Sequence, residues 1–489
     1  MRPGVAAARP LYDRLRAQAT RAPAALALQA GERSLTLPDL LSLADRMVAQ
    51  WQAEGLGPGS FIGWLGHNSP EMLAALLACA QLGAVFVPLN WRLAAPELAA
   101  ITTHAGLSAL KHTPELAGLS GEVAALAPPA GPIEPAQPGD VLLVYTSGTT
   151  GEPKGAMHSQ AGMVANLDIA LAVQGLTPAD RVLAVLPLFH VGGLCIQVLP
   201  ALAVGAPVHL HARFDPAAWL HDVAAWRATT SLLVPAVMQA ILAHPGWPSA
   251  DLSSLRFLNS GSAIVPVALI EAFHARGVPM AQVYGSTETG PFSIALKPDE
   301  ALAQVGSVGR PALGVWLKLA NASGASGTEV PASEVGEIQL RAPNLMRGYH
   351  RLPAGSGFID GWFATGDLAC ADAEGWVTVV GRSKDMIISG GENIYPPEIE
   401  NLAATWPGVA EAAVVGLPDA RWGEVPVLVL TARAGAVVDV DALRQHFNAR
   451  LARFKHPRRI VLVDQMPRTA LGKVQKAALR AQLGDLPPG

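Results

Sequence analysis

The sequence predicts an α/β protein: a large N-terminal domain of layered, parallel-rich sheets with helices and a small β-rich subdomain, followed by a small α+β C-terminal domain. Three observations support this prediction. The chain has 489 residues, more than one hydrophobic core usually serves. Apolar runs of strand length alternate with Ala/Leu-rich helical stretches up to about residue 320. After about Gly314, short strands punctuated by glycine replace that alternation.

The alternating segments follow one another along the first part of the chain. The predicted strands are 60–65, 84–89, 141–145, 181–186, 207–210, 231–234, 257–259 and 280–283. The predicted helices are 71–82, 159–174, 216–228, 237–243 and 266–276. Strands such as 141–145 are apolar on both faces, as expected where helices cover a parallel sheet on both sides.

The second part of the chain has a different pattern. Strands at 336–341 and 376–380 indicate the β-rich section. From about Lys384 onward the predicted strands are 409–415, 425–432 and 459–463, and the predicted helices are 397–405, 439–451 and 474–483. We therefore expect two domains, residues 1–382 and 383–489. Residues 321–333 are predicted to form a surface loop and 128–138 a linker.

Composition excludes several classes of protein. Half of the residues are hydrophobic and 15% are charged, which argues against disorder. The formal net charge of −4 provides no basic field, so we expect no nucleic-acid partner. Cys79, Cys195 and Cys370 are scattered in apolar stretches, which predicts buried thiols in a reducing compartment.

Two apolar stretches, 72–87 and 182–210, are interrupted by glycine and proline. Neither contains the roughly 20 uninterrupted apolar residues that a spanning helix needs, so no transmembrane segment is expected. The first 21 residues lack the apolar core of a signal peptide. A cytoplasmic protein is the expectation.

The strongest local signal follows the strand at 141–145. Glycines there let main-chain N–H groups converge on an anion, hydroxyls add donors and Lys154 adds a positive charge. The segment is not a Walker A loop, because Gly148 is not followed by Gly-Lys-Ser/Thr at the required spacing. The simpler alternative is a surface turn rich in Gly and Thr. The candidate phosphate-binding residues are Thr146, Ser147, Gly148, Thr149, Thr150 and Lys154.

This segment, 146–155, resembles the signature of the acyl-adenylate-forming superfamily, which includes acyl-CoA synthetases, adenylation domains of peptide synthetases and luciferases. The resemblance extends from about Leu11 to Lys476 and brings further motifs in the family's order. It implies an ATP-dependent acid–CoA ligase that forms an acyl-adenylate and then a thioester. ATP, Mg²⁺ and coenzyme A are the cofactor and cosubstrates implied.

The segment 284–290 resembles the family's nucleotide motif. An aromatic ring can stack on adenine, a hydroxyl can hold a phosphate oxygen and a carboxylate can ligate Mg²⁺. The resemblance gives these roles to Tyr284, Thr287 and Glu288, with Gly285 beside them. Mg²⁺ is expected because the charge of ATP must be neutralised before a carboxylate approaches. A polar loop with a helix-capping hydroxyl is the alternative.

Further motifs resemble the family's adenosine contacts. The small residues Gly261, Ser262 and Ala263 would let the main chain lie flat against adenine. Asp367 and Arg382 match the residues that hold the ribose hydroxyls. Taken alone, the Gly-Asp pair that contains Asp367 is more often a turn.

The C-terminal segment resembles the family's moving domain. By that resemblance Lys473 serves adenylation, Gly390 and Gly391 leave room for pantetheine during thioester formation, and Lys384 is the hinge. Without the resemblance, Lys473 would be a solvated lysine and the glycine pair a turn.

The acid is less well defined. His190 and Val191 match the segment that borders the acyl pocket, with His190 as an aromatic gate; a packed core histidine is the alternative. No Lys or Arg lies in 187–193, 258–264 or 284–296, which disfavours a diacid. An apolar monocarboxylate remains, either a fatty or an aryl acid. The other candidate lining residues are Asn259, Ser260, Gly285 and Ile294.

Three rival functions stay open on the sequence. A stand-alone adenylation enzyme would load a carrier protein, a non-catalytic homologue would only bind nucleotide, and a luciferase-like oxidase is remote. The partners expected are a small carboxylic acid, ATP and CoA, and a homodimer is left open.

Overall fold

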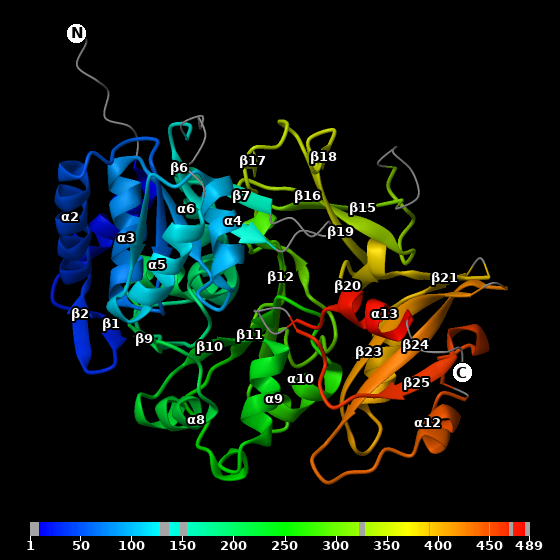
Figure 1. Cartoon of the computed structure of the whole chain (residues 1–489). Coiled ribbons are helices and arrows are strands. Elements are labelled where there is room, and N and C mark those ends of the chain that lie inside the picture. Colours follow the sequence, from blue (N-terminus) through cyan, green and yellow to red (C-terminus); the bar gives the residue numbers. More distant parts are fainter. Residues whose placement is uncertain are drawn as a thin grey trace.

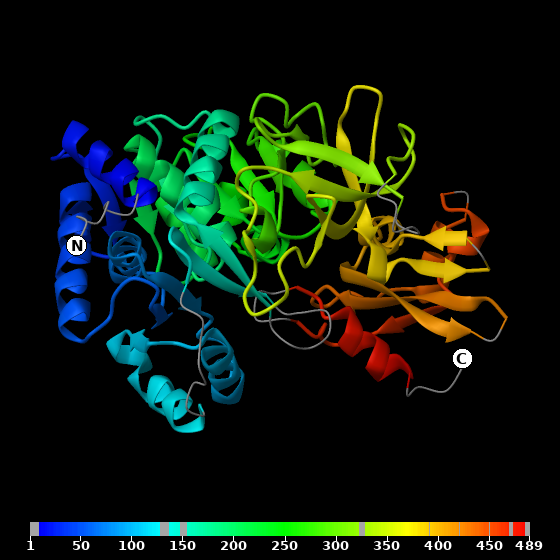
Figure 2. The ribbon, with the colours of Figure 1, turned by 90° about the horizontal axis from the view of Figure 1, so that it is seen from above.

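The computed structural model describes residues 9–127, 136–146, 154–321, 328–390, 392–419, 421–448, 450–468 and 473–484. Within these residues the strands form four sheets. Figure 1 shows the N-terminal elements at one end of the molecule and the last sheet at the other, and the view from above keeps this order (Figure 2).

The first sheet has nine strands in the order β14-β13-β12-β11-β10-β8-β9-β1-β2. The run from β12 to β1 is parallel, and the strands at both edges are antiparallel. Its strands are β1 (Leu26–Ala30), β2 (Arg33–Thr36), β8 (Val182–Ala184), β9 (Val208–Leu210), β10 (Thr230–Leu233), β11 (Leu258–Gly261), β12 (Met280–Tyr284), β13 (Ile294–Ala295) and β14 (Arg310–Pro311). The helices α8 (Pro216–Ala225), α9 (Pro235–Ala243) and α10 (Val267–His274) connect them.

The second sheet has the order β17-β7-β6-β4-β3-β5. Its strands are β3 (Phe61–Leu65), β4 (Val85–Leu89), β5 (Ala109–His112), β6 (Asp140–Thr146), β7 (Lys154–Ser159) and β17 (Gly348–Tyr349). The accompanying helices are α1 (Pro10–Arg21), α2 (Leu37–Ala53), α3 (Pro70–Leu82), α4 (Ala95–Ala105), α5 (Ala117–Leu126), α6 (Gln160–Gln174) and α7 (Leu199–Val204).

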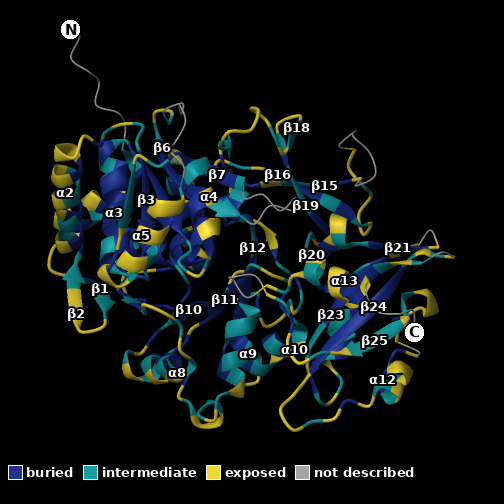
Figure 3. Cartoon of the chain, viewed as in Figure 1, coloured by how far each residue is buried: buried dark blue, intermediate teal, exposed yellow. Residues whose placement is uncertain are grey.

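Helix α3 is apolar nearly all round because it packs in one core with strands of both sheets. Burial therefore covers its whole surface, whereas α2 keeps an exposed outer face (Figure 3). Among the described residues, no helix is both long and apolar enough to cross a bilayer.

The third sheet is antiparallel and small. It has the order β15-β16-β19-β18, and β20 pairs with β19. Its strands are β15 (Trp316–Ala320), β16 (Gly336–Arg341), β18 (Phe358–Ile359), β19 (Trp362–Ala371) and β20 (Val377–Arg382). This is the β-rich section that the glycine-punctuated pattern predicts.

The fourth sheet, with the order β22-β21-β24-β23 and β25 beside β24, forms the separate C-terminal domain. Its elements are β21 (Ile387–Ser389), β22 (Glu392–Ile394), α11 (Pro396–Ala404), β23 (Val409–Asp419), β24 (Gly423–Ala432), α12 (Val440–His446), β25 (Arg459–Leu462) and α13 (Lys476–Gly484). The predicted division after Arg382 falls between β20, in the third sheet, and β21, in the fourth.

The predicted α/β fold class is confirmed, and every strand and helix expected from the sequence is present with ends shifted by a few residues. Two expectations are wrong in detail. The helix predicted at 439–451 ends at His446, because a turn follows there. Cys79 and Cys195 are buried as expected, but Cys370 is partly exposed because β19 lies in a small sheet.

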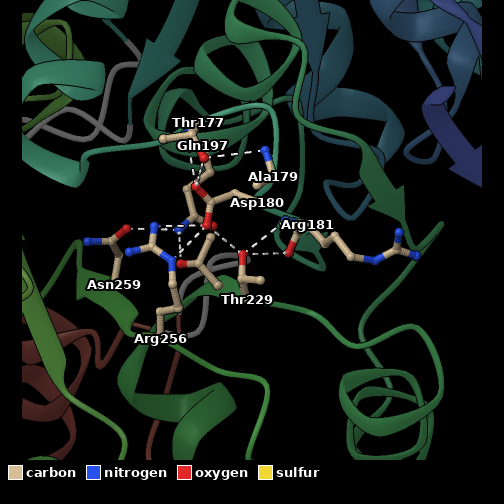
Figure 4. Close-up of polar contacts among 9 residues, drawn as sticks. Thr177, Ala179, Asp180, Arg181, Gln197, Thr229, Arg256 and Asn259 are labelled. Carbon is tan, nitrogen blue, oxygen red and sulfur yellow. Dashed lines mark hydrogen bonds and ion pairs between the residues drawn. The ribbon is translucent and has the colours of Figure 1, made fainter. Parts of the chain in front are cut away.

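A buried carboxylate ties together the amino ends of three parallel strands (Figure 4). Asp180, Thr229 and Arg256 lie just before β8, β10 and β11. The Thr229 hydroxyl donates to Asp180 Oδ1 at 2.9 Å, and Arg256 Nε donates to the same oxygen at 2.8 Å. The Thr177 main-chain N–H donates to Asp180 Oδ2 at 2.8 Å. This Asp180 cluster fixes the strands at the end opposite to their carboxyl ends.

Candidate active site

Two parallel neighbours, β11 and β12, bring glycine-rich segments together at their carboxyl ends, with Gly261 opposite Val283. A Cβ added at Gly261 would lie 2.2 Å from the Val283 carbonyl oxygen, and one at Gly285 would lie 1.6 Å from the Pro291 oxygen. Both positions require glycine because the main chains approach so closely. Ser262 has a φ of 65°, so the chain turns sharply directly after β11.

The side chain of Asp367 contacts two residues from different strands, Tyr284 of β12 and Arg382 of β20. Tyr284 OH donates to Asp367 Oδ2 at 2.8 Å, and Arg382 Nε lies 2.7 Å from Asp367 Oδ1. Asp367 and Arg382 are register partners on β19 and β20, which explains their contact. Burial and the Asp367 charge raise the pKa of Tyr284 well above its usual value, and Asp367 raises the pKa of Arg382. Tyr284 is therefore a neutral donor at pH 7.

Glu288 lies in a 3-10 turn, η4 (Thr287–Thr289), directly after β12. Tyr349 OH donates to Glu288 Oε1 at 3.0 Å, and the Met346 main-chain N–H donates to the Glu288 carbonyl oxygen at 2.7 Å. Tyr349 belongs to β17, which pairs with β7, and Lys154 Nζ lies 5.5 Å from the Tyr349 ring centroid. Tyr349 thus lies next to both Glu288 and Lys154, the basic residue of the predicted phosphate segment.

The loop that carries Glu288 is braced from beneath by two buried asparagines. Asn344 Nδ2 donates to the carbonyl oxygens of Thr289 and Phe292, each at 2.9 Å. Asn166 Oδ1, on α6, accepts the Phe292 main-chain N–H at 3.1 Å. These bonds satisfy buried main-chain groups in a segment that belongs to no sheet.

Lys473 reaches this group of residues from the C-terminal domain. Its side chain keeps contact with solvent, but desolvation by the surrounding protein and the charge of Arg382 lower its pKa, while Asp367 and Glu288 oppose that shift. Burial and the Lys473 charge lower the pKa of His190 to about 4. Lys473 therefore lies within electrostatic reach of all four residues, which come from four separate segments of the chain.

Other predicted residues are placed as follows. Ser147, Gly148, Thr149, Thr150 and Gly391 lie outside the described residues. Thr146 and Lys154 are register partners across β6 and β7. Gly390 has a φ of 60° and its N–H donates to the Trp422 carbonyl oxygen within the fourth sheet.

Lys384 lies in η5 (Ser383–Asp385), between the third and fourth sheets. Burial and the Arg382 charge lower its pKa. Its neighbour Asp385 forms an ion pair with Arg480 of α13 at 2.9 Å, so the C-terminal domain contacts this short connection.

The acyl-pocket candidates are less closely grouped. His190 is half-buried and accepts the Gly192 N–H at Nδ1, at 3.2 Å. Val191 and Ile294 are buried in two different hydrophobic clusters. Asn259 Oδ1 accepts from Gln197 Nε2 at 2.8 Å (Figure 4). Ser260 Oγ lies 3.4 Å from Met238 Sδ. The side chains of Asn259 and Ser260 are thus bonded to the protein itself. Ala263 is exposed, two residues beyond the end of β11.

Comparison with known protein families shows which family the chain belongs to. A model described as AMP-binding enzyme matches residues 15–350, and one described as AMP-binding enzyme C-terminal domain matches residues 398–473. The chain belongs to the AMP-binding enzyme family. It is an enzyme of the acid–CoA ligase branch, whose members use ATP and coenzyme A.

Several AMP-binding enzymes cover nearly the whole chain. An indoleacetate–CoA ligase of Aromatoleum aromaticum is 44% identical over 94% of this chain and 95% of its own length. A feruloyl-CoA synthase of an Amycolatopsis species is 42% identical over 96% and 98%. The crystal structure of the anthranilate CoA ligase AuaEII in complex with anthranoyl-AMP matches with a TM-score of 0.89 at 27% identity, over 96% of each chain.

Sequence reasoning missed four residues of the site. Tyr349, Asn166 and Asn344 hold Glu288 and its loop, and His158 lies fully buried below, where burial lowers its pKa to about 4. Only Tyr349 carried a local signal, since it follows a glycine near a run of basic residues. The others act through contacts between distant segments, which one sequence does not reveal.

Proposed function

We propose that this chain joins an aryl or arylalkyl monocarboxylic acid to coenzyme A by way of an acyl-adenylate. The observation that carries the proposal is the approach of Lys473 to Glu288, Asp367 and Arg382. The aryl class rests on the indoleacetate and feruloyl relatives at 44% and 42% identity. A fatty-acid ligase of Mycobacterium tuberculosis is less similar, at 31% identity.

In the first half-reaction the substrate carboxylate would attack the α-phosphorus of ATP and pyrophosphate would leave. Lys473 would stabilise the negative charge that develops between these groups. Asp367 would accept hydrogen bonds from the ribose hydroxyls, and the ring of Tyr284 would stack on adenine. Thr287 and the segment that starts at Thr146 would donate to phosphate oxygens.

Glu288 fits a magnesium ion, because a carboxylate oxygen is the ligand that Mg²⁺ prefers and Tyr349 fixes its orientation. When bound, the ion would neutralise the phosphate charge. The residues of this chain orient the carboxylate for it: Tyr349 through Oε1, and Met346 through the main chain.

In the second half-reaction the CoA thiol would attack the acyl carbonyl and AMP would leave. We propose that the C-terminal domain then turns about Lys384, which removes Lys473 from the site and brings Gly390 and Gly391 to it. The position of Lys384 between the third and fourth sheets supports this hinge.

His190 would close the acyl end of the site as a neutral ring, since its pKa is about 4. No lysine or arginine stands in the segments proposed to line the pocket, so an uncharged acyl group is favoured over a second carboxylate.

The test is a panel of indole-3-acetate, ferulate, benzoate, palmitate and malonate, with pyrophosphate and AMP release measured with and without CoA. We expect the aryl acids to lead by at least about tenfold in kcat/KM, or about 1.4 kcal/mol. A lead by palmitate would overturn the aryl assignment but keep the ligase. AMP release with a pantetheinylated carrier protein but not with CoA would indicate the carrier-loading alternative.

A further inference from the structure

A second cluster of ligand-type side chains lies on the first sheet, where the proposed function uses none of them. His209 belongs to β9 and His211 follows two residues later. Since side chains alternate along a strand, both rings lie on the same face. Their ring centroids are 5.0 Å apart. Asp222, on α8, approaches from that face, with His211 Nε2 2.8 Å from Asp222 Oδ2.

We propose that His209, His211 and Asp222 bind one divalent transition-metal ion of the zinc class. One ligand atom from each residue lies within 4.8 Å of the others. Two imidazoles and one carboxylate suit Zn²⁺ and its late first-row neighbours, whereas Mg²⁺ and Ca²⁺ prefer all-oxygen sites. This site would be separate from the one that Glu288 would provide.

The polar groups of this cluster are incompletely satisfied by the protein. His209 Nδ1 is buried and has no hydrogen-bond partner among the described residues. A buried, unsatisfied donor or acceptor costs about 1–3 kcal/mol. Binding at His211 Nε2 would replace the His211–Asp222 hydrogen bond, and the proton of the neutral ring would move to Nδ1.

The ligands stand on rigid elements. His209 pairs with Leu183 of β8 and Gln29 of β1, and the His211 N–H donates to the Ala184 oxygen at 3.0 Å. Asp222 is held in turn by His221 Nδ1 at 2.9 Å, and the His221 side chain is 75% exposed. The ligands are thus held in place before an ion binds. The exposed side chain of His221 lies beside Asp222, where an ion could enter from solvent.

One asparagine links this cluster to the segment before His190. Asn68 Nδ2 donates to the His211 oxygen at 3.0 Å and to the Leu186 oxygen at 2.9 Å, and Asn68 Oδ1 accepts the Leu188 N–H at 2.8 Å. A metal ion that fixes the end of β9 would therefore also steady the segment that leads to the acyl end of the active site.

The experiment uses the full chain after treatment with a chelator. Titration calorimetry with Zn²⁺ alone should show one ion per chain at about micromolar Kd, and a saturating excess should raise Tm by several degrees. Co²⁺ should give visible absorption bands typical of nitrogen and oxygen ligands. His211→Gln and Asp222→Asn should each lose the binding by at least about tenfold.

Two control variants locate the ion. Glu288→Gln should keep the Zn²⁺ stoichiometry, since the metal would not be at the ATP site, and His112→Gln, at an exposed histidine of β5, should keep the Kd within about threefold. Absence of Zn²⁺ binding, or unchanged binding in Asp222→Asn, would overturn the proposal. If His211→Gln does not fold, Asp222→Asn, which preserves size, and the X-ray absorption spectrum of the wild-type Zn²⁺ complex decide between two imidazole ligands and none.

Discussion

Two aspartates in this molecule have similar partners and different surroundings. Asp180 accepts from Thr229 and Arg256, and Asp367 accepts from Tyr284 and pairs with Arg382. Both side chains are nearly buried, 3% and 10% exposed. Asp180 lies at the amino ends of the parallel strands, whereas Tyr284 brings the Asp367 group to their carboxyl ends, where α/β sheets bind ligands.

The difference lies in the charges around each group. The partners of Asp180 all come from the turns that lead into one sheet, and each is bonded to it (Figure 4). Around Asp367, Arg382 and Lys473 come close enough for Arg382 to lower the pKa of Lys473. Arg382 is paired with Asp367, and Lys473 lies near the same group, so two cations share this site with the carboxylates of Asp367 and Glu288. Asp180 stabilises a sheet, whereas the proposed function gives the Asp367 group a nucleotide to bind.

The largest effect should come from the second group. Lys473→Met should lower pyrophosphate release by about 10²–10³-fold, because it removes the cation from the developing charge. Its effect on the free energy of unfolding should be small, since the side chain contacts solvent. Stopped assays with a saturating acid measure the first quantity, and urea unfolding measures the second. Loss of stability with full activity would reverse the comparison.

Asp180→Ala should lower stability and leave ATP binding unchanged. It should lower the free energy of unfolding by about 3 kcal/mol, because Arg256, Thr229 and the Thr177 N–H all lose their acceptor. The KM for ATP of the folded fraction should be unchanged, because the residue lies at the far end of the strands. Asp299→Ala, on an exposed surface residue, is the matched control and should change stability by no more than about 0.5 kcal/mol. A raised KM for ATP would mean that Asp180 also contributes to nucleotide binding.

Local pattern predicted many of the strands and helices, because alternating apolar runs and Gly punctuation report burial directly, but it did not name α1, α2 or β1. The resemblance supplied Tyr284, Glu288, Asp367, Arg382 and Lys473, and the structure brings them together. What the sequence could not provide are contacts between distant segments. Asn166 and Asn344 are 178 residues apart and hold the same loop, and nothing local distinguishes them from surface asparagines.

The short elements of the first and second sheets show the same limit. Strands β13, β14 and β17 have two residues each, so no periodicity can appear in them. They exist because neighbouring strands offer free main-chain groups. Yet β17 carries Tyr349, which contacts Glu288, so a functional residue lies on an element that only tertiary structure reveals.

The pH dependence of stability should report on the region around Glu288. His158, buried beneath the Glu288 loop, has a folded pKa of about 4, below its unfolded value near 6.5. Its contribution is therefore full above pH 6.5 and is lost as pH falls toward 4, by at most about 3 kcal/mol. His158→Phe should flatten the decline between pH 6.5 and 4 in urea unfolding. His190 and His350 also have pKa values of about 4, so a slope should remain. An unchanged slope in the variant would mean that His158 is protonated in the folded state.

The smallest change removes one hydroxyl from each region. Tyr349→Phe deletes the donor to Glu288 Oε1 and keeps the ring beside Lys154. The Tyr349 hydroxyl orients the Glu288 carboxylate, and a metal-binding carboxylate depends on such partners for its affinity. We therefore expect about a tenfold fall in kcat/KM and a higher Mg²⁺ concentration for half-maximal rate. Thr229→Val deletes the corresponding donor to Asp180 and should cost about 1 kcal/mol of stability with no change in Mg²⁺ dependence. Rates measured across a Mg²⁺ series compare the two variants directly. If Tyr349→Phe lost only stability, Tyr349 would brace the fold as Thr229 does, and the positioning of Glu288 would have to come from its main-chain bond to Met346.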